Sequence, residues 1–444
     1  MPFLNLKLIV FHHPHNFSTP FSNTNNVGNF LQNIELFYSD IFKKLWCKKC
    51  DPFRLIERVT SGNSNIDKFI KDTIYCARND DCPELPEWIP FDRFININLI
   101  GEGGFAKVYS AIWIDGEAKY FKLDDGNWKR REPEPIKVAL KRLNDSQNMT
   151  SEYLNELIIH WHFCERYGGL QFYGMTKDPE TEEYMMVVQF AEGNLRNFLS
   201  NNFNNLLWKD KIRNLQGMAV DLKYLHKLGY CHQDLHSGNI LQIFDQSYIS
   251  DFGLSRPSDK QKLNNKLCGV LPYIAPEVLN GSTYTSASDI YSFGVIMTEL
   301  SSGKPPFYDK KHDLSLLLAI CNKLRPEFGI GTPEIYKNLA CKCMNAEPNQ
   351  RPTASELNDI LEFWSFSFNM SEDSQEKENF GYKGKEITAT FEEADKEIPN
   401  ISTSYKKDPD AIYTSRVFCF TNLNNISNEE NYKDSQLSGL RIEQ

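Results

Sequence analysis

Three short motifs follow one another near the middle of this chain of 444 residues, and their order constrains the fold more than any other feature. The first holds Asp234 and Asn239, five residues apart in one predicted loop. The second holds Asp251 in the sequence Ser-Asp-Phe-Gly, and the third is Ala-Pro-Glu at 275–277. A carboxylate, an amide and a second carboxylate at these spacings can orient a hydroxyl group and hold a metal ion. Each aspartate alone would be read as a cap or turn residue, so the inference depends on all three motifs in this order.

The composition is that of a mildly acidic globular protein with reduced thiols. Hydrophobic residues make up 41% of the chain, and the net charge of −10 gives no reason to expect a nucleic-acid partner. The eleven cysteines argue against a secreted disulfide framework and for an intracellular, cytoplasmic location. Cys47 and Cys50 have the spacing of half a zinc site, but the next cysteines do not supply a matching pair. No stretch reaches the ~20 apolar residues of a membrane-spanning helix.

The hydrophobic pattern divides the chain into four parts. Residues 1–45 have no sustained period and predict a poorly ordered arm, and 46–90 predict a short helical segment that ends in several prolines. A folded domain is expected over 94–365, followed by a mostly disordered tail over 366–444 because Glu, Lys, Asn and Ser dominate there. Within that tail, 398–423 is apolar enough to dock on a folded surface, although chance apolar residues are an equally good interpretation.

The folded domain changes character near residue 191. Before it, alternating or continuous apolar runs predict an antiparallel sheet with one main helix at 153–163. After it, most apolar residues have helical spacing. The pattern therefore predicts an α+β fold of two lobes, a small sheet-rich lobe at 94–191 and a larger helical lobe at 192–365.

A glycine cluster lies between the first two predicted strands. Gly101, Gly103 and Gly104 have no side chains to keep backbone N–H groups away from phosphate oxygens. Downstream, Lys141 in the sequence Val-Ala-Leu-Lys can pair with phosphates, and Glu156, fifteen residues later, can hold that lysine in place. The glycine pattern alone is a weak signal, and the lysine strengthens it.

Over roughly residues 94–365, these motifs resemble those of the protein kinase superfamily, and the loop from Asp234 to Asn239 is similar to that of the tyrosine-kinase-like group, including large fungal sets. The resemblance implies a two-lobed kinase that transfers the γ-phosphoryl group of ATP, bound with Mg²⁺, to serine or threonine hydroxyls of proteins. Asp234 would orient the acceptor hydroxyl, while Asn239 and Asp251 would hold the metal ion. Protein substrates and signalling proteins would be the partners, and nothing is implied about oligomeric state.

The resemblance also implies which residues surround the nucleotide. Val188 would be the gatekeeper behind the base, and the backbone of Gln189 and Ala191 would form the edge that binds it. Glu152 is the fallback partner for Lys141. The other nucleotide-binding positions would be Ile100, Gly101, Gly103, Gly104, Val108, Ala139, Lys141 and Glu156.

Four positions depart from the family pattern. Gln233 replaces an arginine that usually reads a phosphate on the activation loop, so activation through that residue is not expected. His236 stands where serine/threonine kinases have a catalytic lysine, which a histidine can partly replace, and Val270 stands where they have a bracing threonine. Ala106 stands at the position of the last glycine in the family's glycine-rich pattern, Gly-x-Gly-x-x-Gly. These departures favour, as an alternative, a weakly active or inactive kinase-like scaffold that binds ATP and partners, with tyrosine or dual specificity as a subordinate possibility.

Residues outside the reaction centre also carry predictions. His160 follows Glu156 by four residues, where the family usually has an apolar residue, and we expect a core histidine satisfied by hydrogen bonds. Asp289 is expected to anchor the backbone of the loop that holds the catalytic aspartate, and Arg351 to pair with Glu277.

Overall fold

The computed structural model describes residues 60–76, 86–103, 106–117, 120–122, 128–130, 134–143, 146–147, 151–167, 169–257, 266–369 and 378–419. The predicted arm at 1–45, the cysteine pair at 47 and 50, and Gly104 lie outside these residues.

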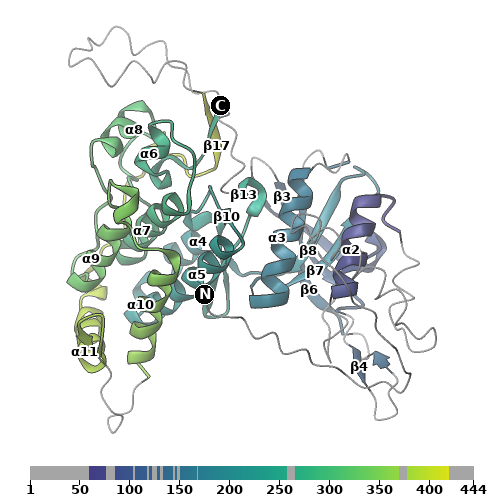
Figure 1. Ribbon diagram of the computed structural model, residues 1–444, viewed down its shortest axis with the longest axis horizontal. Coiled ribbons are helices and arrows are strands. Elements are labelled where there is room, and N and C mark those ends of the chain that lie inside the picture. Colours follow the sequence, from purple (N-terminus) through teal and green to yellow (C-terminus); the bar gives the residue numbers. More distant parts are fainter. Residues whose placement is uncertain are drawn as a thin grey trace, which may run out of the picture. The chain divides into compact units, whose positions relative to one another are not determined.

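The smaller lobe is built on a sheet of six strands in the order β1-β7-β8-β6-β3-β2, in which only β1 runs parallel to its neighbour (Figure 1). Residues of alternating and continuous hydrophobicity form these strands, and their inward side chains, such as Trp113, Val138 and Val187, are buried. The strands are β1 (Glu87–Trp88), β2 (Phe94–Glu102), β3 (Ala106–Trp113), β6 (Ile136–Leu143), β7 (Phe172–Lys177) and β8 (Tyr184–Gln189). The predicted antiparallel sheet is confirmed.

Two helices accompany this sheet. Helix α3 (Ser151–Tyr167) is the predicted main helix, extended by a few residues at each end. Helix α2 (Ser64–Cys76) comes from the segment before the domain and buries Ile66 and Ile70, and its Phe69 ring lies 6.2 Å from Phe172 of β7. In the connection between β3 and β6, the described residues include the paired strands β4 (Tyr120–Lys122) and β5 (Trp128–Arg130).

The larger lobe is helical, as predicted. Its central helix α7 is buried along nearly its whole length, begins at a capping box formed by Thr285 and Ser288, and ends at Gly303 in a left-handed conformation. The helices are α4 (Leu195–Asn202), α5 (Trp208–Lys227), α6 (Pro276–Leu279), α7 (Ser286–Ser302), α8 (Leu314–Cys321), α9 (Glu334–Cys343), α10 (Ala354–Ser367) and α11 (Gly384–Asp395). Short strands complete it: β9 (Gly193–Asn194), β10 (Tyr230–Cys231), β11 (Ile240–Ile243), β12 (Gln246–Ile249), β13 (Arg256–Pro257), β14 (Lys266–Gly269), β15 (Glu378–Asn379), β16 (Tyr382–Lys383) and β17 (Arg416–Cys419).

The prediction of a mostly disordered tail is wrong for its described part, residues 378–419. Helix α11 packs on α5 and α10 and buries Ile387 and Phe391 completely. The Asp395 carboxylate at its end accepts a hydrogen bond of 2.7 Å from the backbone N–H of Trp208, the first residue of α5. The apolar residues of α11 keep a helical spacing, but they are outnumbered by charged neighbours, and the composition of the segment therefore hides them.

Residues 398–419, called here the C-terminal segment, run from α11 along the larger lobe. They end in β17, which pairs antiparallel with β14, and Figure 1 shows these two strands side by side. Ala411 and Phe418 of this segment are buried. Among the described residues, no helix has the length and apolar character that a bilayer crossing requires.

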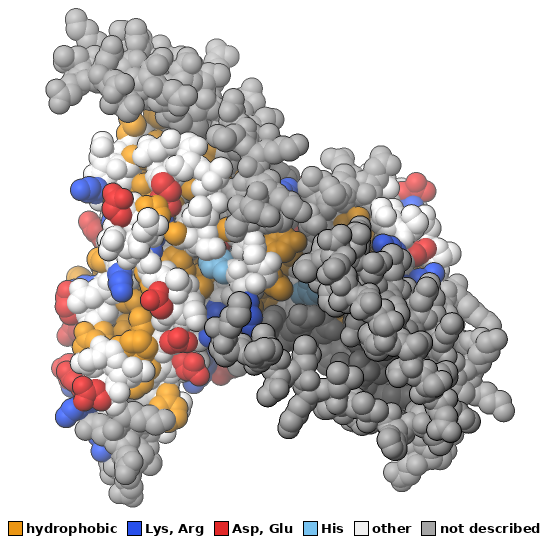
Figure 2. All heavy atoms as spheres, in the orientation of Figure 1, with side chains coloured by type: hydrophobic (Ala, Val, Ile, Leu, Met, Phe, Trp, Pro, Cys, Tyr) orange, Lys and Arg blue, Asp and Glu red, His pale blue; other side chains and the backbone are white. Residues whose placement is uncertain are grey.

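On the face drawn in Figure 2, acidic and basic side chains alternate over the described part of the larger lobe, with apolar side chains between them.

Candidate active site

Lys141 lies on β6 at the centre of a group of three charges. Its Nζ is 2.5 Å from Oε1 of Glu156 on α3 and 2.9 Å from Oδ1 of Asp251. Burial disfavours a charged ammonium, but the carboxylates of Asp251 and Glu156 outweigh that cost and raise the pKa of Lys141. The lysine is therefore a permanent cation, and the structure pairs it with Glu156, the first choice made from the sequence.

Strand register brings the predicted nucleotide-binding positions together. Gly101 of β2 lies opposite Val108 of β3, and Val108 lies opposite Lys141 of β6. The backbone N–H of Gly103 donates a hydrogen bond of 2.9 Å to the carbonyl of Ala106, which closes the turn between β2 and β3. The side chain of Ile100, next to Gly101, is 52% exposed, as expected for an apolar residue that would cover a ligand rather than fill a core.

The predicted gatekeeper and base-binding edge lie on β8 and the connection that follows it. Val188 is buried and faces Ala139 across the β6–β8 pair. The backbone N–H of Gln189 donates to the carbonyl of Gln171, and Ala191 follows β8 at the start of the larger lobe. Both predicted positions therefore belong to the segment that links the two lobes.

Asp234 and Asn239 lie on a loop that the larger lobe fixes rigidly. The carboxylate of Asp289 on α7 accepts backbone hydrogen bonds of 2.8 Å from His232 and 3.0 Å from Gln233, so its predicted anchoring role is confirmed. The Nδ2 of Asn239 donates to the carbonyl oxygen of Asp234 at 3.0 Å. That bond leaves the amide oxygen of Asn239 as the atom available to a cation.

Asp251 has the backbone conformation expected of a residue under functional constraint. Its φ of 65° and ψ of 71° lie in the left-handed region, which costs a non-glycine residue roughly 1 kcal/mol or more. Its side chain contacts Lys141 and remains 43% exposed. A carboxylate from Asp251 and an amide oxygen from Asn239 are hard oxygen donors of the type that Mg²⁺ prefers, so this pair fits the predicted ion.

His236 lies beside Asp234, as its predicted role requires. Its Nδ1 accepts a hydrogen bond of 3.0 Å from the backbone N–H of Gly238, so in the neutral ring the proton is on Nε2. Nε2 is 3.7 Å from Oδ2 of Asp234. Val270 is buried nearby and offers no polar atom, as its identity implies.

The structure adds one residue that sequence reasoning missed. The hydroxyl of Ser415, in the C-terminal segment, donates a hydrogen bond of 2.5 Å to Oδ2 of Asp234. It also lies 3.3 Å from Nε2 of His236. The only signal for it was the apolar character of the segment around it, which indicated docking but not the surface on which it docks.

His160 is buried, but the expectation that hydrogen bonds satisfy it is wrong. Within the described residues neither ring nitrogen has a hydrogen-bond partner. The ring instead contacts Phe252, with centroids 4.9 Å apart, and Phe172, at 6.5 Å. Burial, followed by the charge of Lys141, lowers the pKa of His160 to about 3, so the ring is neutral.

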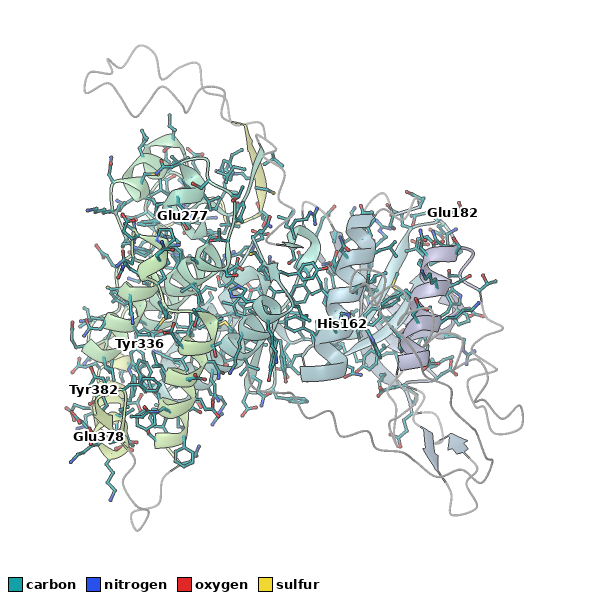
Figure 3. The ribbon with its side chains drawn as sticks, viewed as in Figure 1. His162, Glu182, Glu277, Tyr336, Glu378 and Tyr382 are labelled. Atoms are coloured by element: carbon teal, nitrogen blue, oxygen red, sulfur yellow. The ribbon has the colours of Figure 1, made fainter. Side chains whose placement is uncertain are left out.

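The predicted pairing of Arg351 with Glu277 is confirmed. Two guanidinium nitrogens of Arg351 donate to the two carboxylate oxygens of Glu277, each at 2.7 Å. Glu277, labelled in Figure 3, belongs to α6 in the larger lobe. The bidentate pair therefore fixes the segment that follows β14 against the helical core.

Comparison with known proteins agrees with this geometry. The family described as protein tyrosine and serine/threonine kinase matches residues 95–361. A probable serine/threonine-protein kinase of Dictyostelium discoideum is 28% identical over 267 residues, which cover 59% of this chain and 15% of that relative. Another from the same organism is 26% identical over 282 residues, covering 61% and 28%. Cysteine-rich receptor-like protein kinase 6 of Oryza sativa subsp. japonica is 29% identical over 296 residues, covering 61% and 39%. The chain thus spans less than half the length of each of these relatives.

Proposed function

Because the chain belongs to the protein tyrosine and serine/threonine kinase family, we propose that it transfers the γ-phosphoryl group of ATP to serine or threonine hydroxyls of proteins. The observation that carries this proposal is the contact of Lys141 with both Glu156 and Asp251. In that arrangement the cation for the nucleotide phosphates and the carboxylate for the metal ion lie side by side.

Each residue then has a defined role in the transfer. Lys141 binds the α- and β-phosphates, and Asp234 orients the acceptor hydroxyl and receives its proton. Asn239 and Asp251 hold Mg²⁺, which supplies positive charge that offsets the negative charge of the phosphates. His236 donates a hydrogen bond from Nε2 in the region where other serine/threonine kinases use a lysine.

Serine or threonine specificity is supported by how close the backbone of the C-terminal segment lies to the Asp234 carboxylate. A serine side chain of the C-terminal segment already spans that distance, with 2.5 Å between its hydroxyl and the carboxylate. A tyrosine side chain is several ångströms longer than a serine side chain, so in the same register its hydroxyl would lie past the carboxylate. The two Dictyostelium relatives are named as probable serine/threonine-protein kinases, which agrees with this choice.

We further propose that activity does not depend on a phosphate read by residue 233. Gln233 is neutral, and its Nε2 is buried without a hydrogen-bond partner among the described residues. An amide in this position cannot replace the bidentate, charged contact that an arginine makes with a phosphate.

We also propose a cytoplasmic location, because the cysteine usage is that of a protein with reduced thiols.

The second candidate function, an inactive scaffold that binds ATP, is favoured by one specific observation. Val270 and His236 put an apolar side chain and an imidazole ring where serine/threonine kinases have a threonine and a lysine that brace each other. Loss of one contact to the transition state typically lowers turnover on the order of 10²-fold. The two candidates therefore differ in rate and not in fold.

The deciding experiment is transfer of labelled phosphate from ATP with Mg²⁺ to casein by the full chain, comparing wild type with Asp234→Asn. We expect at least a ~10²-fold loss in the variant, because the acceptor hydroxyl is no longer oriented or deprotonated. Asp245→Asn, the same change at an exposed aspartate on the β11–β12 turn, should keep full activity. Equal labelling by wild type and Asp234→Asn contradicts the proposal, and ATP-induced thermal stabilisation without transfer favours the scaffold. Phosphoamino-acid analysis identifies the acceptor type.

A further inference from the structure

The C-terminal segment is held on the larger lobe by its own backbone. The N–H of Asp408 donates a hydrogen bond of 2.8 Å to the carbonyl of Tyr308, and the N–H of His312 donates one of 3.1 Å to the carbonyl of Asp410. The His312 ring also bonds to the carbonyl of Ile412, 2.8 Å from its Nδ1. These bonds fix the path of the chain immediately before Ser415.

Tyr413 anchors the segment two residues before Ser415. Its hydroxyl donates a hydrogen bond of 2.8 Å to the carbonyl of Pro306. Its ring lies 4.7 Å from the guanidinium of Arg196 and 4.8 Å from the ring of His312. Arg196 also donates a hydrogen bond of 3.1 Å to the backbone carbonyl of Tyr413. A buried aromatic ring with a satisfied hydroxyl is the kind of residue that dominates the energy of a docking contact.

After Ser415, β17 aligns with β14 as an added strand. Val417 lies opposite Cys268 and Arg416 lies opposite Gly269. Gly269 has a φ of 139°, and a Cβ built there would lie 3.4 Å from Oδ1 of Asp234. The φ of Gly269 is one that residues with side chains rarely adopt, and the strand pairing fixes the register in which Ser415 meets Asp234.

Ser415 has the geometry of an acceptor hydroxyl. It donates its proton toward Oδ2 of Asp234 at 2.5 Å, and Nε2 of His236 lies 3.3 Å from the Oγ of Ser415 itself. The neighbouring hydroxyl of Thr414 is on an exposed residue, whereas Ser415 is half-buried against the site. Among the described serine and threonine side chains, Ser415 is the one whose hydroxyl contacts the Asp234 carboxylate.

We propose that Ser415 is a phosphorylation site of this protein and that the chain's own active site modifies it, within the same molecule. The proposal depends on the kinase activity proposed above. In the step, the Ser415 oxygen forms a bond to the γ-phosphorus of ATP, and the bond from that phosphorus to the β–γ bridging oxygen breaks. ADP leaves with the bonding electrons, and the serine proton passes to Asp234.

The test incubates the full chain with ATP and Mg²⁺ and maps phosphorylated residues by mass spectrometry. We expect up to one phosphate per molecule at Ser415, none at that site in Ser415→Ala, and an unchanged level at Ser415 in Thr414→Ala. Ser415→Thr should restore an acceptor at this position. Because the reaction is intramolecular, the rate per molecule should stay constant over a 100-fold dilution of the enzyme.

A mixing experiment separates modification within one molecule from modification between molecules. Asp234→Asn chains incubated with active wild type should stay unphosphorylated at Ser415, and phosphate on those chains overturns the proposal. Casein labelling without phosphate at Ser415 also overturns it, while the kinase proposal stands. Absence of both signals overturns the kinase proposal as well.

Discussion

The neutral, polar ring of His160 lies in a row of packed rings. The rings of His232, Phe252, His160 and Phe172 follow one another with centroid distances of 5.5, 4.9 and 6.5 Å and so connect the two lobes. The nitrogens of His160 gain nothing from this environment, because no described residue bonds to them. The ring therefore packs as an apolar group only while it stays deprotonated.

Replacement of His160 by leucine should reduce the dependence of stability on pH. The pKa of His160 is about 3 in the folded chain, against 6.5 for the ordinary side chain. Between these values the unfolded chain binds a proton that the folded chain does not, so the free energy of unfolding falls as pH falls below 6.5. From about pH 7.5 to about pH 5, His160→Leu should lose about 2 kcal/mol less than wild type. Urea unfolding at both pH values measures this, and parallel losses would contradict it.

Short-range polar spacing made most of the active site predictable from the sequence. Asp234, Asn239 and Asp251 lie close together in the chain, and their chemistry restricts what they can do. Ser415 could not be found in this way, because its contact with Asp234 joins residues 181 positions apart. The absence of hydrogen-bond partners at His160 was equally hidden, since it depends on which elements pack around the ring and not on its own neighbours in the chain.

At the scale of elements, α11 shows how a few apolar residues can decide the structure of a charged segment. The Phe391 ring lies 5.6 Å from Trp208, 5.5 Å from Trp364 and 5.7 Å from Phe368. The average composition of the segment does not reveal these contacts, because glutamates and lysines surround the few apolar residues that make them. Tertiary packing of one face stabilises the helix, and that packing is set by α5 and α10.

Removal of the Phe391 ring should therefore destabilise the larger lobe as a whole. Phe391→Ala leaves a cavity among buried rings and should lower the free energy of unfolding by about 3–5 kcal/mol. Tryptophan fluorescence during urea unfolding is a direct measurement, because two tryptophans contact the ring. Thr390→Ala, at the adjacent exposed position, should change stability by less than about 0.5 kcal/mol. A loss below about 1 kcal/mol in Phe391→Ala would mean that α11 is peripheral to the fold.

At the scale of the whole molecule, the C-terminal segment occupies the carboxylate that an external acceptor would use in the proposed reaction. While Ser415 is bonded to Asp234, no second hydroxyl can take its position. The rate of labelling of an external protein is then limited by the fraction of molecules whose segment has left the site. Phosphate on Ser415 would place a second negative charge against Asp234, and repulsion would favour departure of the segment.

Weakening the contacts of Tyr413 should raise phosphorylation of an external protein and lower phosphorylation of Ser415. Tyr413→Ala removes the hydroxyl bond to Pro306 and the ring contact with Arg196, while every group that binds ATP or orients the hydroxyl stays intact. A loss of about 1.4 kcal/mol in docking raises the free fraction tenfold when that fraction is small. We therefore expect casein labelling to rise about tenfold and phosphate at Ser415 to fall, with Thr414→Ala unchanged in both. If casein labelling in Tyr413→Ala stayed at the wild-type rate while Ser415 lost its phosphate, the segment would be a substrate of the site without competing for it.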